Sequence, residues 1–277
     1  MLSMNLPQID HRALYKTAVS QTGRNVDKAV LQAMEDRVVK AGEDYTSHLN
    51  GAGAWAVTPL LMSADEDKLA RKMYDSRLVS KEGICRQTYV QIRQSATACP
   101  YCEYGEVYEV DHFLPKDDFP ELNIFPANLV PICHPCNHIK LVGRPMNAAD
   151  SLLHPYFDRL PRDVRWLFAT MSSNGNGPVL AYSVQLDAAY GSLAGRLSWH
   201  FDKLQLGRRF RERSSKVLVE IESDLEGLFE TLGPDGLSAH FSSVSQKKFS
   251  DHGNVLEAAA YAAAAANLSY CAGDYRN

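Results

Sequence analysis

Residues 99–140 read CPYCEYGEVYEVDHFLPKDDFPELNIFPANLVPICHPCNHIK, a stretch that holds four of the six cysteines of the chain. A C-x-x-C pair lies near each end, Cys99 with Cys102 and Cys133 with Cys136, with thirty residues between the pairs. A C-x-x-C turn presents two thiolates on one small loop, and two such loops complete a tetrahedral zinc site that has no open coordination position. We therefore predict a structural Zn²⁺ held by these four cysteines.

Two other interpretations of the cysteines stay open: four unrelated buried thiols, or a thioredoxin-like redox pair. Six cysteines in 277 residues are too few for a disulfide scaffold, and two close pairs in a reducing compartment indicate metal binding. The tight spacing, with a proline inside each pair, also favours zinc. The remaining Cys85 and Cys271 are expected to be small buried hydrophobic residues.

Between the cysteine pairs the sequence predicts a strand, a long loop, a second strand and a helix. Val107, Tyr108 and Val110 indicate the first short strand, and prolines at 115, 120, 126 and 131 punctuate the segment after it. Residues 128–132 predict the second strand, and 134–142 the helix.

The polar residues of this stretch suit phosphodiester hydrolysis, which needs a water nucleophile, a base and a cation to stabilise developing charge. Asp111 and Asn137 offer two oxygen ligands for Mg²⁺ or Mn²⁺, from a strand end and a helix start. His112, with an ordinary pKa of about 6.5, suits the general base. Neighbouring strand residues point to opposite faces, so we expect the strand end to twist and bring Asp111 and His112 together.

Residues 99–140 resemble the HNH endonuclease superfamily, on the motifs EVDHFLP, NLVP and CNHIK. The resemblance implies a ββα-metal core in which Asp111 and His112 end the first strand and Asn128 holds the loop that orients His112. Asn137 stands at the position that opens the helix, where the family has His or Asn, so the chain is similar to the H-N-N variant. An amide oxygen there still suits a hard cation.

Three residues of the stretch keep alternative roles. Lys140 either contacts a phosphate or is a solvated helix residue. Glu109 lies on the same strand face as Asp111, either as a second carboxylate of the metal site or as a salt-bridged surface residue. His138 could assist DNA binding or replace a metal ligand, although Asn137 already fills that position. Farther along, His154 is expected to be a packing residue in a turn.

Around this core the sequence predicts an α+β protein with three regions: a helical region at 1–95, the nuclease core at 96–145, and a β-hairpin with helices at 146–277. The expected helices are 25–49, 64–73 with Ser63 as N-cap, 82–95, 191–205, 207–232 and 254–270, and the expected strands are 164–171 and 179–186. The alanine-rich tract at 258–266 is either a partner surface or, more simply, a buried packing helix.

The net charge of −4 and the sequence pI near 6.1 argue against a protein that coats nucleic acid nonspecifically. A local basic face would be enough for a nuclease. Arg209, Arg213 and Lys216 are expected to share one face of the predicted helix 207–232, where they either contact phosphates or pair with the acidic residues that come after them.

The resulting hypothesis is a metal-dependent endonuclease that cuts DNA, since the HNH resemblance implies DNA and the motif by itself does not separate DNA from RNA. The alternatives are a zinc-stabilised nucleic-acid-binding or partner-binding module without catalysis, and an RNA-cleaving toxin nuclease. The layout of a nuclease core within helices, followed by the HPYF segment at 154–157, also looks like HNH subunits of bacterial antiphage systems of the Septu type. That resemblance implies an ATPase partner.

No stretch approaches the roughly 18 apolar residues of a membrane span, and MLSMNLPQIDHR at the start lacks the features of a secretory signal. We expect a soluble, cytoplasmic protein without membrane contact.

Overall fold

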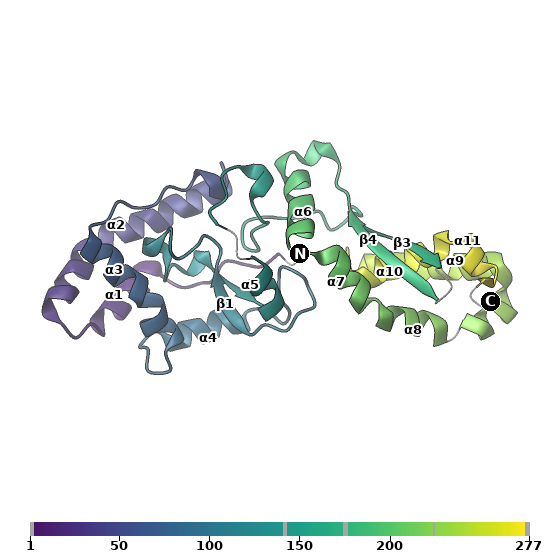
Figure 1. The fold of residues 1–277 in the computed structure, drawn as a ribbon, viewed down its shortest axis with the longest axis horizontal. Helices are drawn as coiled ribbons and strands as arrows, with labels where there is room; N and C mark the ends of the chain where they lie inside the picture. Colours follow the sequence, from purple (N-terminus) through teal and green to yellow (C-terminus); the bar gives the residue numbers. More distant parts are fainter. Residues whose placement is uncertain (1–2, 141–142, 174–176, 224, 275–277) are drawn as a thin grey trace. The chain divides into compact units, whose positions relative to one another are not determined.

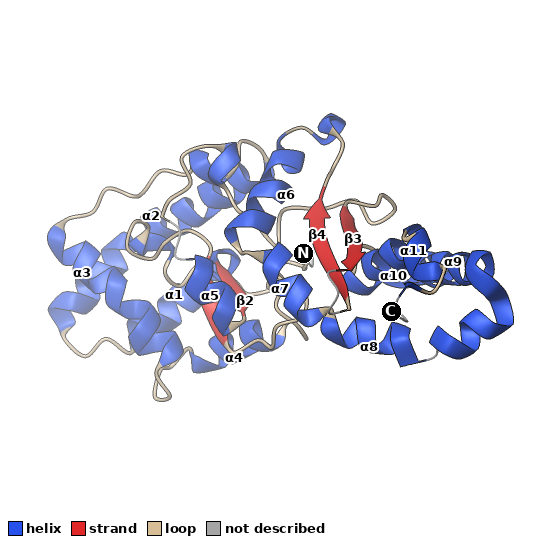
Figure 2. Cartoon of the chain, turned by 45° about the vertical axis from the view of Figure 1, so that its right-hand side comes forward, coloured by secondary structure: helices blue, strands red, loops and turns tan. Residues whose placement is uncertain are grey.

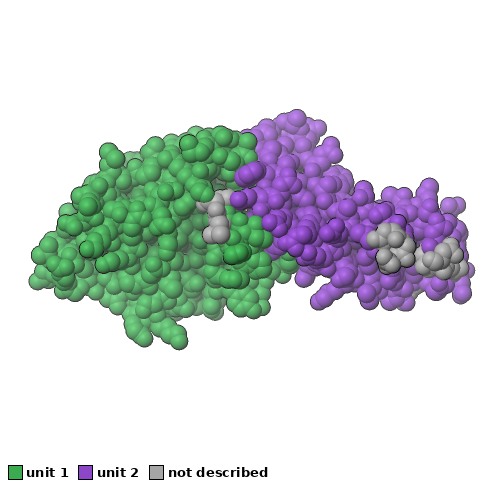
Figure 3. Space-filling model, viewed as in Figure 1, with its two compact units in different colours: residues 1–159 green, residues 160–277 purple. Residues whose placement is uncertain are grey.

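The computed structural model describes residues 3–140, 143–173, 177–223 and 225–274 of the chain. They form two compact units, Met1–Arg159 and Leu160–Asn277, coloured green and purple in Figure 3. Helices dominate both units, and each contains one two-stranded antiparallel sheet. The predicted α+β class is therefore compatible with the structure. The region expected to be the core, 96–145, lies inside the first unit, and the division into three regions stays a prediction.

The first unit contains five α-helices and two strands among its described residues. They are drawn in purple to teal in Figure 1. These are α1 (His11–Ser20), α2 (Asn25–Asn50), α3 (Ala64–Met73), α4 (Arg86–Gln94), β1 (Glu109–His112), β2 (Leu129–Ile132) and α5 (His134–Lys140). Short 3-10 turns lie at Ala54–Ala56, Pro120–Leu122, Pro126–Asn128 and Ala148–Asp150, and a π-helical turn at Tyr74–Val79. The predicted end of the last helix at 142 lies outside the described residues.

Helix α3 begins where the sequence predicts. The Ser63 hydroxyl accepts from the Glu66 amide, and the Glu66 carboxylate accepts from the Ser63 amide at 2.8 Å, which completes a capping box. The helix runs directly into the π-helical turn that begins at Tyr74. The Tyr74 hydroxyl donates to the Val110 carbonyl at 2.5 Å, so the end of this helical segment is fixed to strand β1.

The core of the first unit joins the helices to the small sheet. Val110 and Leu129 from the strands and Ile124 from the loop between them are buried in the same cluster as helical residues such as Met34 and Ile92. Burial of one such side chain contributes about 1.5–3 kcal/mol. The hairpin is therefore supported by the helices on which it packs.

Strands β1 and β2 pair antiparallel, with Asp111 opposite Val130 and His112 opposite Leu129. The loop between them closes on itself, because the Phe113 amide donates to the Asn128 carbonyl at 2.7 Å. Burial alternates along β1: Val110 and His112 are buried, whereas Glu109 and Asp111 are half-buried. This alternation decides which side chains can meet α5.

The second unit is a β-hairpin with helices, drawn in Figure 2 with red strands and blue helices. Its elements are β3 (Leu167–Ser173), β4 (Pro178–Val184), α6 (Ser192–Lys203), α7 (Leu206–Arg213), α8 (Ser215–Ser223), α9 (Leu225–His252), α10 (Leu256–Ala266) and α11 (Leu268–Cys271), with a 3-10 turn at Ala188–Tyr190. Helix α10 contacts β3 and α9. The alanine tract is thus a buried packing helix, with Ala258, Ala260 and Ala264 almost fully buried.

The prediction of one long helix over 207–232 is wrong. The Ser214 hydroxyl donates to the Arg211 carbonyl at 2.7 Å and the Ser223 hydroxyl to the Glu220 carbonyl at 2.8 Å, near the ends of α7 and α8. Serine competes in this way with the helical hydrogen bonds of the backbone. Helix α9 continues far beyond 232, with a break at Gly233, whose φ of 67° is non-helical.

Among the helices of the described ranges, none combines the length and the apolar character needed to cross a bilayer.

Half-buried His11 makes the stability of the fold depend on pH. Its ring packs on Phe125 with centroids 4.7 Å apart, and neither ring nitrogen has a hydrogen-bond partner among the described residues. Burial lowers the pKa of His11 to about 4. Between pH 6.5 and 4 the His11 imidazole is protonated in the unfolded chain but stays neutral in the folded protein. The free energy of unfolding therefore falls as the pH decreases from 6.5 towards 4.

We expect His11→Leu to reduce this acid destabilisation, and calorimetric melting temperatures between pH 7 and pH 4 measure it. His252→Leu, at an exposed histidine, is the control. An equal pH dependence of the melting temperature in the wild type and the His11 variant would contradict the assignment of this destabilisation to His11.

Candidate functional site

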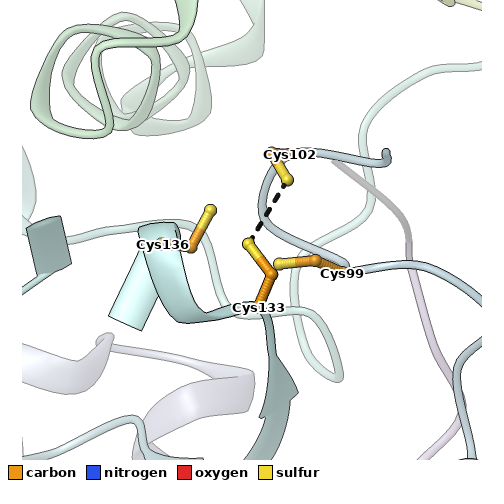
Figure 4. Close-up of side chains that lie close together, drawn as sticks. All are labelled: Cys99, Cys102, Cys133 and Cys136. Atoms are coloured by element: carbon orange, nitrogen blue, oxygen red, sulfur yellow. Dashed lines mark hydrogen bonds between the residues drawn. The ribbon is translucent and has the colours of Figure 1, made fainter. Parts of the chain in front are cut away.

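Four buried cysteine side chains meet at one point in the first unit (Figure 4). Cys99 and Cys102 come from the loop before β1, Cys133 follows β2 and Cys136 lies in α5. Their sulfurs all lie within 4.8 Å of one another, and the Sγ atoms of Cys102 and Cys133 are 3.8 Å apart. The described residues contain no other such cluster of histidine, cysteine and acidic ligands.

The donor set fits a zinc ion. A Zn–S distance of about 2.3 Å gives a tetrahedron whose sulfurs are roughly 3.8 Å apart. The 3.8 Å between the Cys102 and Cys133 sulfurs matches this edge and is far longer than the roughly 2.05 Å of a disulfide bond, so these two sulfurs are not bonded to each other. Hydrogen bonds from Cys133 and Cys136 lower the pKa of Cys102, and a thiolate is the form that binds metal. The cluster can hold a metal ion, as predicted.

Gly105 is part of this cluster, although no prediction from the sequence included it. Its amide donates to the Cys102 sulfur at 3.4 Å and its carbonyl accepts from the Cys99 amide at 2.7 Å. A Cβ at this position would lie 2.7 Å from the Cys133 sulfur. Only glycine leaves room for the sulfurs, and a glycine three residues after a C-x-x-C pair was the available signal.

His112 is 4% exposed and lies at the end of β1. Its Nε2 is 2.8 Å from the Asn123 carbonyl oxygen, which can only accept, so Nε2 carries the proton and Nδ1 keeps its lone pair. The Tyr74 ring covers the imidazole with centroids 4.3 Å apart. The expectation of an ordinary pKa is wrong, because burial lowers the pKa of His112 to about 4.

The loop that carries Asn123 is held by Asn128. The Asn128 Oδ1 accepts from the Leu114 amide at 2.8 Å, and its Nδ2 donates to the Leu114 carbonyl at 3.2 Å. Asn128 is fully buried. Its geometry suits the predicted loop-holding role.

Asp111 and Lys140 form an ion pair between β1 and α5. The Lys140 Nζ lies 2.7 Å from Asp111 Oδ2 and 2.6 Å from the His112 carbonyl oxygen. Lys140 is 5% exposed, so it is not a solvated surface residue. A phosphate contact by its ammonium group stays a prediction.

Asn137 and His134, both on α5, meet the carboxylate of Glu109. The Asn137 Nδ2 donates to Glu109 Oε2 at 2.5 Å, and the His134 Nδ1 is 2.8 Å from Glu109 Oε1. Glu109 is therefore neither free nor paired with a surface lysine or arginine. His138 is exposed, one helical turn after His134.

A cavity of 370 Å³ brings these residues together. Glu109, Asp111, His112, Asn137 and Lys140 all line it. Its remaining lining residues are Tyr74, Asp75, Val79, Tyr89, Val110, Pro115, Lys116 and Asp117. The predicted base and both predicted oxygen ligands thus reach one space, although Asp111 and His112 alternate in burial along β1.

The predicted basic face of Arg209, Arg213 and Lys216 does not form on one helix. Arg209 is buried in α7 and donates to the Leu204 carbonyl at 3.2 Å, whereas Arg213 and Lys216 are exposed. Arg213 ends α7 and Lys216 lies in α8, so the three do not share one face of a single helix. The break at Ser214 separates them.

Two polar residues of the loop were also missed. Glu121 is 2% exposed, its Oε1 accepts from the Leu60 amide at 2.9 Å, and burial raises its pKa. Asn123 is 1% exposed, and neither side-chain polar atom has a partner among the described residues. The signal in the sequence was the pair of polar residues within the apolar run FPELNIF.

Two curated proteins are similar to this chain. Protein ea31 of Escherichia phage lambda is 30% identical over 168 residues, which cover 57% of this chain and 49% of that protein. Septu protein PtuB of Bacillus thuringiensis is 29% identical over 110 residues, which cover 32% of this chain and 42% of that protein. The chain thus spans less than half the length of these relatives. No protein-family profile matches it, and neither does any solved structure.

The position of Gly105 gives a direct test of the cysteine cluster. We expect Gly105→Ala to lower the metal content per chain and the melting temperature, because the added Cβ displaces the sulfur of Cys133. Elemental analysis of the purified protein measures the metal. Gly23→Ala is the matched control, since a Cβ there meets nothing within 4 Å. Full metal content in Gly105→Ala would contradict the conclusion that only glycine at this position leaves room for the sulfurs.

Proposed function

We propose that the chain is a metal-dependent DNA endonuclease of the HNH type. One observation carries the proposal: Asp111, His112 and Asn137 line one 370 Å³ cavity, beside a cluster of four cysteines. The order β1, β2, α5, with a cysteine pair before β1 and another from the end of β2 into α5, is the order that the motif implies.

His112 is the proposed general base. The Asn123 carbonyl fixes the tautomer in which Nδ1 can accept a proton from water. The lowered pKa keeps the imidazole neutral at physiological pH, as a base must be before it acts. Burial under Tyr74 holds the ring in one orientation. The loop held by Asn128 supplies the fixing carbonyl, so Asn128 acts through His112.

Asp111 and Asn137 are the proposed ligands of the catalytic cation. A carboxylate oxygen from β1 and an amide oxygen from α5 are the hard donors that Mg²⁺ or Mn²⁺ takes, with waters completing the shell. Bound there, the cation would stabilise charge on the phosphate and the leaving oxygen. The Asp111 Oδ2 accepts from Lys140, which restrains the carboxylate. Lys140 also donates to the His112 carbonyl, which restrains the end of the strand.

The biological setting is proposed from similarity. The likeness to Septu protein PtuB supports a role in antiphage defence, and the Septu resemblance of the sequence supports an ATPase subunit as partner. DNA is the proposed substrate because the resemblance is to DNA endonucleases.

We expect His112→Ala to abolish cleavage of supercoiled plasmid in Mg²⁺ or Mn²⁺. Removal of the base leaves no group to deprotonate the water, and the loss should be at least about 100-fold. His252→Ala is the matched control, because His252 is an exposed histidine at the end of α9 that does not line the cavity. A chelator should stop the wild type. Cleavage that survives His112→Ala would refute the assignment, and cleavage of RNA but not of plasmid would identify the toxin alternative.

A second candidate is a binding module without catalysis. The Lys140 ammonium already neutralises Asp111, which is an arrangement that needs no metal. Intact plasmid and intact RNA under all metal conditions, both alone and with the ATPase of the same system, would favour this module.

Arg213 and Lys216 are proposed phosphate contacts, since both are exposed cations. We expect Arg213→Gln and Lys216→Gln each to weaken DNA binding for all sequences and to reduce the slope of log K against log salt by about one. Arg209→Gln should instead lower stability, because Arg209 is buried against the Leu204 carbonyl. Fluorescence anisotropy across salt concentrations measures the slope. Unchanged slopes in both exposed variants would place the phosphate contacts elsewhere.

A further inference from the structure

Two side-chain contacts join β1 to α5, and they lie side by side. Glu109 contacts Asn137 and, two residues on, Asp111 contacts Lys140. Residues i and i+2 of a strand share one face, and residues i and i+3 of a helix are neighbours on one side. The register of the strand against the helix therefore presents Glu109 to Asn137 in the same way that it presents Asp111 to Lys140.

The contact with Glu109 decides which atom of Asn137 faces it. An ionised carboxylate only accepts hydrogen bonds, so the amide nitrogen of Asn137 must point to Glu109 Oε2, at 2.5 Å. The amide group is planar and carries its oxygen on the opposite side from its nitrogen. The Nδ2 contact thus turns Oδ1 away from Glu109, and the same side chain lines the cavity with Asp111 and His112.

Both oxygens of Glu109 are occupied by α5. Oε1 lies 2.8 Å from the His134 Nδ1, and Oε2 accepts from Asn137. The Glu109 side chain is 33% exposed and lies between two contacts from one helix. Each oxygen of the Glu109 carboxylate thus already has a contact with α5, whereas the Asp111 carboxylate uses Oδ2 for Lys140.

We propose that Glu109 is a positioning residue that holds the Asn137 amide with its oxygen towards the cavity. Without Glu109 the amide can rotate and present its N–H groups, which repel a cation. The inference rests on the proposed function, in which Asn137 is a ligand, and it assigns to Glu109 a role distinct from that of a second metal carboxylate.

Three variants separate positioning from ligation. Glu109→Ala removes the acceptor. Glu109→Gln keeps an oxygen that can accept from Asn137 but removes the charge that a direct ligand would supply. Glu106→Ala is the matched control, because Glu106 is an exposed glutamate three residues earlier that does not line the cavity. Zinc content of each variant confirms that the cysteine cluster is intact.

Two readouts are needed, and one of them requires no catalytic metal. Calorimetric titration with Mn²⁺ should show affinity weakened about 10–100-fold in Glu109→Ala, as for lost partners of metal ligands, and changed less than about threefold in Glu109→Gln. The side-chain amide resonances of Asn137, recorded in metal-free protein, should move in Glu109→Ala and stay near the wild-type position in Glu109→Gln.

Equal weakening of Mn²⁺ binding by Gln and Ala would overturn the proposal in favour of a direct ligand. Unchanged Asn137 resonances in Glu109→Ala would overturn it as well. If the wild type binds no Mn²⁺, the proposed catalytic metal fails, and the resonances still decide whether Glu109 orients Asn137. Asn137 amide resonances that move in Glu109→Ala and stay near the wild-type position in Glu109→Gln then support the positioning role alone.

Discussion

Four cysteine sulfurs join the loop before β1 to the end of β2 and the start of α5, and the candidate site depends on that junction. The two strands have four residues each, and α5 has seven. An isolated two-stranded hairpin is marginal in water, and so is an isolated helix of this length. A metal held by all four sulfurs would fix α5 against the hairpin. The contacts of Asn137 and Lys140 with β1 then result from the position in which α5 is held along the strand.

The surrounding helices add the second constraint, which is the burial of His112. The π-helical turn after α3 brings Tyr74 onto the imidazole and onto the Val110 carbonyl. Burial disfavours the charged form of the ring, and the Asn123 carbonyl compensates by accepting the one proton that remains. The histidine is thus kept neutral and immobile, at the expense of being a weaker base than a free imidazole.

Local chemistry made much of this predictable from the sequence. The C-x-x-C spacing predicted the sulfur cluster, Ser63 as N-cap predicted the start of α3, and the loop between two apolar runs predicted β1 and β2. Contacts between distant segments were not predictable. The pKa of His112 depends on Tyr74 and on the depth of the loop, and the pairing of Lys140 with Asp111 depends on how α5 lies on β1. The break at Ser214 depended on a side chain that bonds its own helix.

In the proposed function, one cavity holds a cation between Asp111 and Asn137, apart from the metal of the cysteine cluster. Anomalous diffraction from crystals soaked in MnCl₂, with data collected on both sides of the zinc and manganese edges, tests it directly. We expect a zinc peak between the four sulfurs, about 2.3 Å from each. We also expect a manganese peak in contact with an Asp111 carboxylate oxygen and the Asn137 amide oxygen. A cavity without manganese, with Lys140 still on Asp111, would contradict the claim.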